Sequence, residues 1–302
     1  MSDNLDALRR QVGAAADLKS VVRAMKALAA SSLGEYEKSV LSLRDYSRAI
    51  EQGLIACGLQ SPGYLPAPQR ASGATAVGIV IFGSDQGLVG QFNEIIAEFL
   101  QAKFPGSTKL HIWAIGERVA DTLTEKGFEI QLFELPTAIQ SIGLLIGHVL
   151  VAIQGFQEKA NSLEIHVIRH RPTTGSTYEP YSQLLLPLDK QWWSINVKKW
   201  PTNQIPQTIA PPTTTFAALV REYIFVSLFQ ACAESLASEN ASRLVGMQRA
   251  EKNIDELSLA LTQQFHRLRQ SSIDEELFDV VSGFQSLSPR ARPHGKNDIN
   301  TV

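Results

Sequence analysis

The sequence predicts an α/β domain between two long terminal helices that pair with each other as an antiparallel coiled coil. Three observations lead to this prediction. Residues 3 to about 56 carry one apolar stripe at helical spacing, and residues 76 to about 188 alternate strand and helix patterns. Residues 213–282 contain no proline and a single glycine, Gly246. A chain of 302 residues is long enough to bury a large core within such an arrangement.

The first helix is predicted from apolar positions that recur every three or four residues. This period of about 3.5 residues is typical of a coiled-coil seam, with one slip that changes its winding. Residues 61–73, rich in proline and glycine, then end regular structure. The predicted stripe comprises Leu5, Leu8, Val12, Ala15, Leu18, Val22, Met25, Ala29, Ser32 and Tyr36, and resumes through Val40, Leu43, Ser47, Ile50 and Leu54.

The middle block alternates short β-type runs with helical patterns, which implies a parallel-rich sheet covered by helices. Its apolar segment Ala138–Phe156 has the composition of a membrane span, but polar residues interrupt it, so we predict a buried helix of a soluble domain. The predicted strands are Val77–Phe82, Leu110–Ile115, Phe128–Phe133, Leu163–Arg169 and Tyr181–Leu186, and the helices are Phe92–Phe104, Glu117–Lys126 and the segment after Pro136.

The C-terminal helix is predicted from an unbroken three-four repeat of about 70 residues, which is roughly 100 Å of helix. A helix of this length cannot bury its stripe on itself, and the first helix is its nearest partner. We expect Leu5 to lie near Phe265, and the turns after about Leu268 to extend beyond the partner. The repeat runs through Phe216, Leu219, Tyr223, Val226, Gln230, Ala233, Ala237, Asn240, Leu244, Met247, Glu251, Ile254, Ser258, Leu261, Phe265, Leu268 and Ser272.

A glycine-rich turn, "GSDQGLVGQFN", lies between a predicted strand and a predicted helix, where many proteins hold a phosphate. A P-loop needs Lys and then Ser or Thr after its last glycine, but Gln91 and Phe92 follow Gly90. The spacing of Gly83, Gly87 and Gly90 also differs from the dinucleotide fingerprint. We therefore expect no nucleotide cofactor, and glycines that supply positive φ and close approach of the backbone.

Other catalytic patterns are weak. His166 and His170 are four apart on a predicted strand, about 13 Å from each other, so we expect no metal site there. Cys57 and Cys232 are far apart and are expected to be reduced thiols. The net charge of −2 gives no general reason to bind nucleic acid, and the charged N-terminus does not read as a signal peptide. We expect no catalytic residue.

Three basic residues, Lys19, Arg23 and Lys26, form a stripe on the first helix with no acid on the same helix to pair with. The polar residues that flank the C-terminal seam include many Arg, Gln, Asn and Glu. Both features fit an ordinary solvated coiled-coil surface, and both also fit contacts to a surrounding protein.

Four separated motifs, in order, resemble the gamma subunit of F-type ATP synthases: "VVRAMKALAASSLGEYEKSV", "GSDQGLVGQFN", "AESLASENASRLVGM" and "RQSSIDEELFDVVSG". The resemblance implies a coiled coil of the terminal helices with a Rossmann-like α/β domain. It also implies a central rotor, non-catalytic by itself, whose partners are alpha and beta subunits, epsilon and the membrane c-ring. Such a protein lies on the cytoplasmic side of a bacterial plasma membrane or thylakoid, associated with the membrane only through its complex.

The resemblance also assigns candidate contacts between this rotor and its surrounding ring. Met25 and Lys26 match the shaft region that meets beta, and Arg243, Arg269 and Gln270 match polar positions that meet the ring. The chain departs from the common loop at Gln86, Val89 and Gln91 and from the common C-terminus at Asp274. The segment "LVREYIFVSLFQACAESLASENASRL" looks more like the gamma of the alternate F-type ATPases, which are often considered sodium pumps.

We expect five segments: a coiled-coil helix over 1–60, the Rossmann-like domain over 74–190, a proline-rich linker over 191–212, the second helix over 213–285 and a disordered tail over 286–302. Two other functions stay open at this point. One is a free-standing coiled-coil adaptor with an α/β module, and the other is a nucleotide-dependent enzyme that uses the turn from Gly83 to Gly90.

Overall fold

Two long helices dominate the secondary structure of the chain. The computed structural model describes residues 2–60, 76–105, 110–158, 163–173, 178–188, 204 and 207–287. Helix α1 spans Ser2–Gln60 and helix α6 spans Pro212–Leu287, so both predicted helices form, and both are longer than their stripes indicate. Most of the proline-rich linker, and the predicted tail from residue 288 on, lie outside the described residues.

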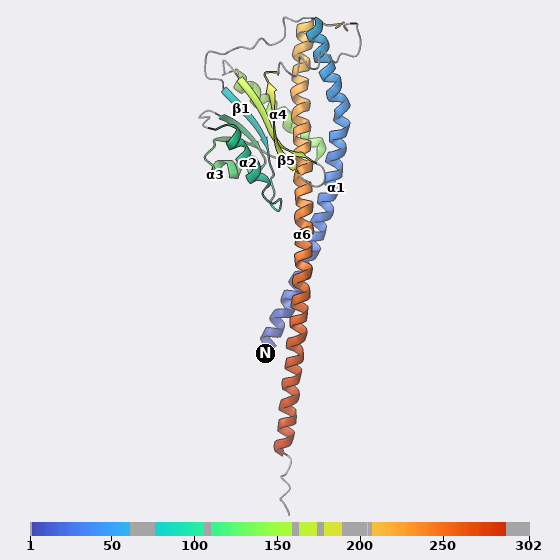
Figure 1. The fold of residues 1–302 in the computed structure, drawn as a ribbon, viewed down its shortest axis with the longest axis vertical. Coiled ribbons are helices and arrows are strands. Elements are labelled where there is room, and N and C mark those ends of the chain that lie inside the picture. The colour runs from blue at the N-terminus through green and yellow to red at the C-terminus, as the bar shows by residue number, and fades with distance from the viewer. Residues whose placement is uncertain are drawn as a thin grey trace, which may run out of the picture. The chain divides into compact units, whose positions relative to one another are not determined.

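The chain divides into two compact units. Unit 1 combines the residues up to Arg23 with those from Ala250 on, and unit 2 spans Ala24–Arg249. Unit 2 contains the sheet, together with the parts of α1 and α6 that lie beside it (Figure 1). Both long helices contribute to each unit.

The sheet of unit 2 has five strands in the order β3-β2-β1-β4-β5. β1, β2, β3 and β4 run parallel, and β5 pairs antiparallel with β4. The predicted alternation of strands and helices is therefore confirmed, with shifted ends. The elements are β1 (Ala76–Phe82), α2 (Phe92–Lys103), β2 (Leu110–Ile115), α3 (Glu117–Glu125), β3 (Ile130–Phe133), α4 (Ile139–Gln157), β4 (Leu163–Pro172) and β5 (Tyr178–Leu186).

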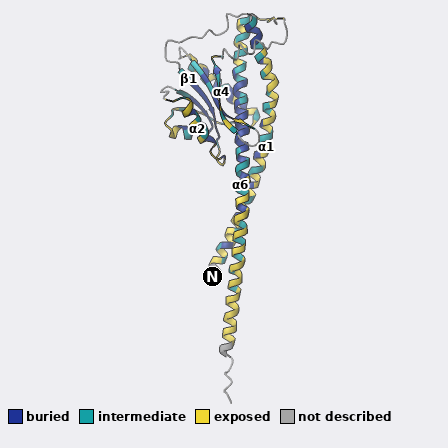
Figure 2. Ribbon diagram, viewed as in Figure 1, coloured by how far each residue is buried: buried dark blue, intermediate teal, exposed yellow. Residues whose placement is uncertain are grey.

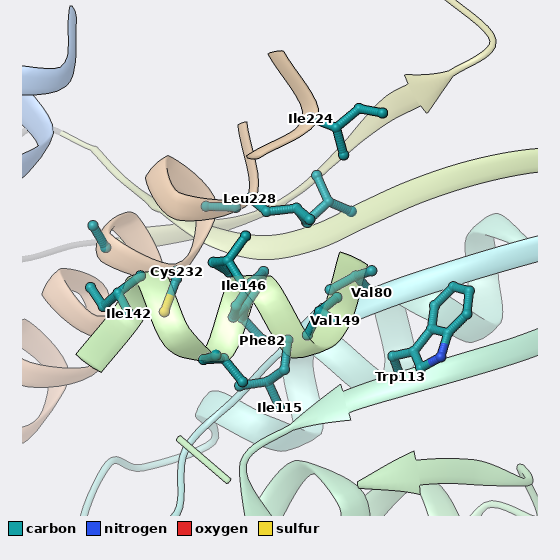
Figure 3. Close-up of a cluster of buried hydrophobic side chains, with 14 of the residues drawn as sticks. Val80, Phe82, Trp113, Ile115, Ile142, Ile146, Val149, Ile224, Leu228 and Cys232 are labelled. Atoms are coloured by element: carbon teal, nitrogen blue, oxygen red, sulfur yellow. The ribbon is translucent and has the colours of Figure 1, made fainter. Parts of the chain in front are cut away.

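Strand β1 is buried from Gly78 to Phe82 because helices cover both faces of the sheet. Its odd-numbered residues Ile79 and Ile81 belong to one apolar cluster, with α2 and α3. Its even-numbered residues Val80 and Phe82 belong to another cluster, with α4 and α6. Figure 3 shows the second cluster, where Ile146 of α4 and Leu228 of α6 lie among the side chains of the central strands. The period of two along the strand thus decides which helix each side chain meets.

Helix α6 is most deeply buried where it passes the sheet. Every residue from Ala231 to Asn240 is buried, whereas residues 273–284 are all exposed (Figure 2). On α1 the buried positions Leu8, Ala15, Val22, Ala29 and Tyr36 recur every seven residues. This heptad confirms the coiled-coil stripe.

The predicted stripe is wrong at Leu18, whose side chain is 52% exposed. Strict heptad spacing from Ala15 to Val22 leaves Leu18 at the edge of the seam, where the neighbouring Lys19 forms an ion pair with Asp255 of α6. At this edge of the seam an ion pair therefore forms where the stripe predicted an apolar contact.

The register of the two helices in unit 1 is defined by two ion pairs. Lys19 pairs with Asp255, and Arg23 pairs with Glu251 at 2.8 Å. Because the helices are antiparallel, going 14 residues back from Lys19 means going 14 forward from Asp255, which places Leu5 opposite Arg269. Leu5, Phe265 and Arg269 line one groove. The expected proximity of Leu5 and Phe265 is confirmed, with the helices shifted by one turn.

Within the part of the chain that the structure describes, two helices are long and apolar enough, by length and composition alone, to be candidate membrane spans: α4 and the Pro212–Phe284 part of α6. One face of α4 packs in the core through Ile142, Ile146 and Val149, as expected for a domain helix. Its opposite face exposes Leu144 and Val151. The middle of α6 is buried in unit 2 by protein.

Candidate functional site

The glycine-rich loop after β1 forms a compact turn whose polar groups bond to each other. The Ser84 amide donates to Asn93 Oδ1 at 3.0 Å, and Asn93 Nδ2 donates to Ser84 Oγ at 2.9 Å. The Ser84 hydroxyl in turn donates to the Gln86 carbonyl. Ser84 is fully buried, so these groups are not presented to a ligand.

Two of the three loop glycines have the roles predicted for them. A Cβ at Gly83 would lie 2.2 Å from Val119 Cβ, and Gly90 has φ +64°. Gly87 shows neither feature, since its Cβ would meet open space. Leu88 also has φ +64°, an uncommon conformation for a side chain of this kind, which the sequence did not indicate. The loop is therefore shaped by close packing at its start and by two left-handed residues at its end.

The sheet reverses its strand order between β1 and β4, and in open α/β sheets ligands bind in the crevice outside the carboxyl ends of such strands. Here α6 covers those ends. Ser235 Oγ donates to the carbonyl of Phe82, the last residue of β1, and Ser238 Oγ donates to the carbonyl of His170 in β4. Helix α6 therefore occupies part of the position that a ligand takes in such sheets.

A buried ion pair fixes α6 against the edge of the sheet. Arg169 of β4 donates through Nε to Glu234 of α6 at 2.6 Å, and through Nη1 to Gln183 of β5. Gln230 donates to the other oxygen of Glu234 at 2.7 Å. Removing one partner of such a pair is far more costly than the net stabilisation that the pair supplies.

A second buried pair lies one turn further along α6. Glu239 accepts from Arg243 Nη2 at 2.6 Å, and Asn240 accepts from Arg243 Nη1. Glu239 Oε2 and Arg243 Nε have no hydrogen-bond partner in the described chain. Burial raises the pKa of Glu239 from 4.5 to about 7, against the lowering effect of Arg243. This pair lines a cavity of about 310 Å³, together with residues of α1 and the loop.

The five predicted ring-contact residues lie in both units. Met25 and Lys26 are half-buried on α1, and Met25 lines the cavity that also holds Arg243. Arg243 is only 9% exposed, and its guanidinium donates to Glu239 and Asn240 of the same helix. Arg269 and Gln270 are exposed on α6 in unit 1. Nothing in the structure tests their contacts with another subunit, which stay predictions.

The basic stripe of α1 is in contact with solvent, and it also pairs with acidic residues of α6. Arg23 keeps a 59% exposed side chain while it pairs with Glu251, and Lys19 pairs with Asp255. The bond to Glu251 raises the pKa of Arg23. These acids lie on α6, more than 200 residues away in sequence, so only pairing of the two helices could identify them.

Sequence reasoning missed the two buried pairs, Arg169 with Glu234 and Glu239 with Arg243. One signal for these pairs was present in the sequence. Charged residues occur within the stretch of α6 that also carries the three-four repeat of apolar residues. The two histidines for which no metal was expected contact protein groups: His170 contacts the Phe92 carbonyl through Nε2 at 2.7 Å, and His166 contacts Glu164 at 3.5 Å. Among the described residues, no three His, Cys, Asp or Glu side chains are grouped as a metal site would require.

Comparison with known proteins gives consistent results. A family model described as ATP synthase matches residues 4–287. The chain is 26% identical to the ATP synthase gamma chain of Syntrophus aciditrophicus over 93% of its own length and 97% of that protein. It is 23% identical to the gamma chain of Polynucleobacter necessarius, covering 91% and 96%.

Solved structures share the fold. A chain from the mitochondrial ATP synthase of Euglena gracilis, in a structure of OSCP, F1 and c-ring, matches with a TM-score of 0.65 and 14% identity, covering 98% of this chain and all of that one. A chain from the rotor of the same enzyme matches with a TM-score of 0.60 and 16% identity, covering 90% of this chain and all of that one. The family match over nearly its full length shows that the chain belongs to the ATP synthase family, and the relatives that it matches are gamma chains.

Proposed function

We propose that this chain is the central rotor that couples ion flow through a membrane c-ring to ATP synthesis or hydrolysis in a ring of alpha and beta subunits. In this role α6 turns inside the ring while the α/β domain serves the connection to the c-ring. Epsilon would also bind the α/β domain. The assembly would lie on the cytoplasmic face of a bacterial plasma membrane or thylakoid. The gamma chains that it resembles, and the rotor and c-ring structures that share its fold, support this proposal.

The observation that carries the proposal is the apolar end of α6. Ile273, Leu277 and Val281 recur every four residues and are 46%, 58% and 53% exposed, and Phe278 and Val280 beside them are 72% and 70% exposed. The register of unit 1 places the start of α1 near residue 272 of α6, so these turns extend beyond α1. An apolar helix end of this kind is stabilised by a surrounding protein sleeve.

The rotor acts by shape and charge rather than by forming bonds. An asymmetric shaft makes different contacts with each beta subunit, and a shaft that favours one beta conformation over another changes the nucleotide affinity of that subunit. Rotation then moves this preference around the ring. The exposed polar residues Arg269 and Gln270 and the half-buried Met25 and Lys26 are the proposed contacts.

We further infer that the chain serves the alternate F-type ATPase variety, because residues 219–244 of α6 resemble that group. The gamma subunit makes no contact with the transported ion, so the ion depends on the c subunit that accompanies it. The genes that lie beside the gene of this chain test this inference. Adjacent genes for a housekeeping F-type ATP synthase would overturn it.

The experiment for the rotor function is reconstitution. Alpha and beta subunits with this chain are expected to form a stable complex that hydrolyses ATP, and the whole enzyme in vesicles is expected to pump ions in an ATP-dependent manner. The isolated chain is expected to hydrolyse no ATP. Leu277→Glu with Phe278→Glu should weaken assembly, because charges would enter an apolar sleeve. A chain that fails to associate with alpha and beta would contradict the proposal and favour a free-standing adaptor.

A further inference from the structure

Three serines of α6 bind three separate segments of the α/β domain through one face of the helix. Ser235, Ser238 and Ser242 are spaced by three and four residues, and we call them the serine seam. Ser235 donates to the carbonyl of Phe82 at 3.4 Å. Ser238 Oγ lies 3.4 Å from the carbonyl of His170, and its shorter bond, at 2.9 Å, goes to the Glu234 carbonyl of its own helix. Ser242 donates to the Val89 carbonyl at 2.7 Å, the shortest of the three bonds.

Gly246 continues the same face one turn beyond Ser242. A Cβ at this position would lie 3.3 Å from the Leu88 carbonyl oxygen, so the glycine allows the loop backbone to approach α6 closely. The loop reaches this position through the left-handed conformations of Leu88 and Gly90. The Tyr178 hydroxyl of β5 also lies 3.5 Å from Ser242 Oγ. The loop and the helix therefore meet through backbone and small polar side chains.

These contacts constrain α6 in addition to the close-packed core that buries every residue from Ala231 to Asn240. Hydrogen bonds require alignment of donor and acceptor. Neighbouring residues of an α-helix are about 100° apart around its axis, so even a rotation by one residue would remove all three seam bonds.

We propose that the serine seam, with Gly246, transmits torque between α6 and the α/β domain, so that loop and helix rotate as one body. The proposal rests on the rotor function proposed above. It makes Ser242 and Gly246 positioning residues for coupling, since they act on the orientation of α6 and touch neither nucleotide nor ion. The nearby pair of Arg169 and Glu234 adds a second fixed point on the same helix.

The test compares ions pumped per ATP hydrolysed in vesicles that contain the complete enzyme. Ser242→Ala combined with Gly246→Val removes the shortest bond and pushes the loop away from α6, and we expect about a twofold or greater loss in that ratio. Ser242→Thr keeps the hydroxyl and should retain the wild-type ratio. Thr124→Val is the matched control, because Thr124 makes a bond of the same kind to the Ala120 carbonyl within α3.

A disulfide provides the second measurement. Val89→Cys with Ser242→Cys would join the loop to α6 across the contact that the seam makes. If the two segments rotate together, the oxidised enzyme should pump as well as the reduced one, with formation of the disulfide checked by mass spectrometry. A loss of pumping that a thiol reductant restores would show that the segments must separate, and would overturn the proposal.

The outcomes distinguish this proposal from the function on which it rests. Wild-type enzyme that fails to assemble or to pump would overturn the rotor function and the seam with it. Wild-type enzyme that pumps, alongside a Ser242→Ala and Gly246→Val enzyme with an unchanged ratio, would overturn the seam alone. A loss seen equally in the Thr124→Val control would assign the effect to general destabilisation and also overturn the seam.

Discussion

Glu239 is a buried carboxyl group whose second oxygen has no hydrogen-bond partner in the described chain. The charged groups around Glu239 are Arg243 on its own helix and Asp85 on the loop. Burial raises the pKa of Tyr36 of α1 and of Cys232 of α6, and the charge of Glu239 raises both further. Burial is the largest effect and raises its pKa to about 7. A proton on Glu239 therefore stabilises the folded chain.

This shift gives stability a dependence on pH with a defined sign. The pKa of Glu239 is higher in the folded state than its ordinary value of 4.5, so its contribution is fully present below pH 4.5 and is lost as pH rises through about 7. The advantage of wild type over Glu239→Gln should shrink by at most about 2 kcal/mol between pH 5 and pH 8. Urea unfolding of the free chain at each pH measures it. An advantage that does not change with pH would mean that Glu239 stays ionised throughout.

The contribution of His170 to stability changes with pH in the opposite direction. Burial lowers its pKa from 6.5 to about 4, so its contribution is present above pH 6.5 and is lost as pH falls toward 4. Wild type should lose about 2 kcal/mol more than His170→Gln between pH 7 and pH 5. The same urea titration tests this, and equal losses would contradict it. Between pH 4.5 and 6.5 the contributions of His170 and Glu239 therefore have opposite signs and partly cancel.

At the scale of single elements, the α1–α6 seam of unit 1 depends on few buried side chains. Ile254 is 7% exposed, while Leu257, three residues further along α6, is 53% exposed. The two residues are alike in chemistry and differ in the face of the helix that they occupy. They therefore form a matched pair for testing the seam.

Ile254→Asp should destabilise the free chain by about 3 kcal/mol, because it places an unpaired carboxylate in the seam. Leu257→Asp should change stability by less than about 0.5 kcal/mol, because its side chain is in solvent. Chemical denaturation monitored by circular dichroism at 222 nm compares the two. Equal effects of the two substitutions would mean that α1 does not cover Ile254 in solution.

The elements that the sequence predicted well are those with strong periodicity. The heptad of α1, the three-four repeat of α6 and the buried strand β1 were all recognisable, because burial on one face or on both leaves a repeat in the sequence. The exact register was not predictable, since the pairs Lys19 with Asp255 and Arg23 with Glu251 each combine residues from opposite ends of the chain. The shift of Leu5 by one turn follows from these pairs.

The polar part of the candidate site was the least predictable. Ser235, Ser238 and Ser242 read as ordinary small residues of a helix, and the carbonyls that accept from them leave no signal in the sequence. The sequence shows that no Lys followed by Ser or Thr comes after Gly90, as a phosphate clamp would require. The position of α6 over the ends of β1 and β4 was not predictable, because it is set by tertiary contacts.

At the scale of the whole molecule, the chain has two kinds of apolar surface. The clusters of unit 2 are closed by the sheet with α2 and α3 on one face, and with α4, α1 and α6 on the other. The end of α6, by contrast, exposes Ile273, Leu277, Phe278 and Val280. The free chain therefore gains little stability from residues 274–284, whereas an assembled rotor would bury them.

Truncation after Ile273 separates these two contributions. The free truncated chain should melt within about 3 °C of the full chain, because the removed turns bury little apolar surface. The same truncation should sharply reduce ATP-driven ion pumping in the assembled enzyme, since the apolar end would no longer fill the ring. Differential scanning calorimetry and vesicle pumping measure the two effects. A large loss of melting temperature would mean that the end of α6 packs within the free chain, and undiminished pumping would mean that the ring does not use it.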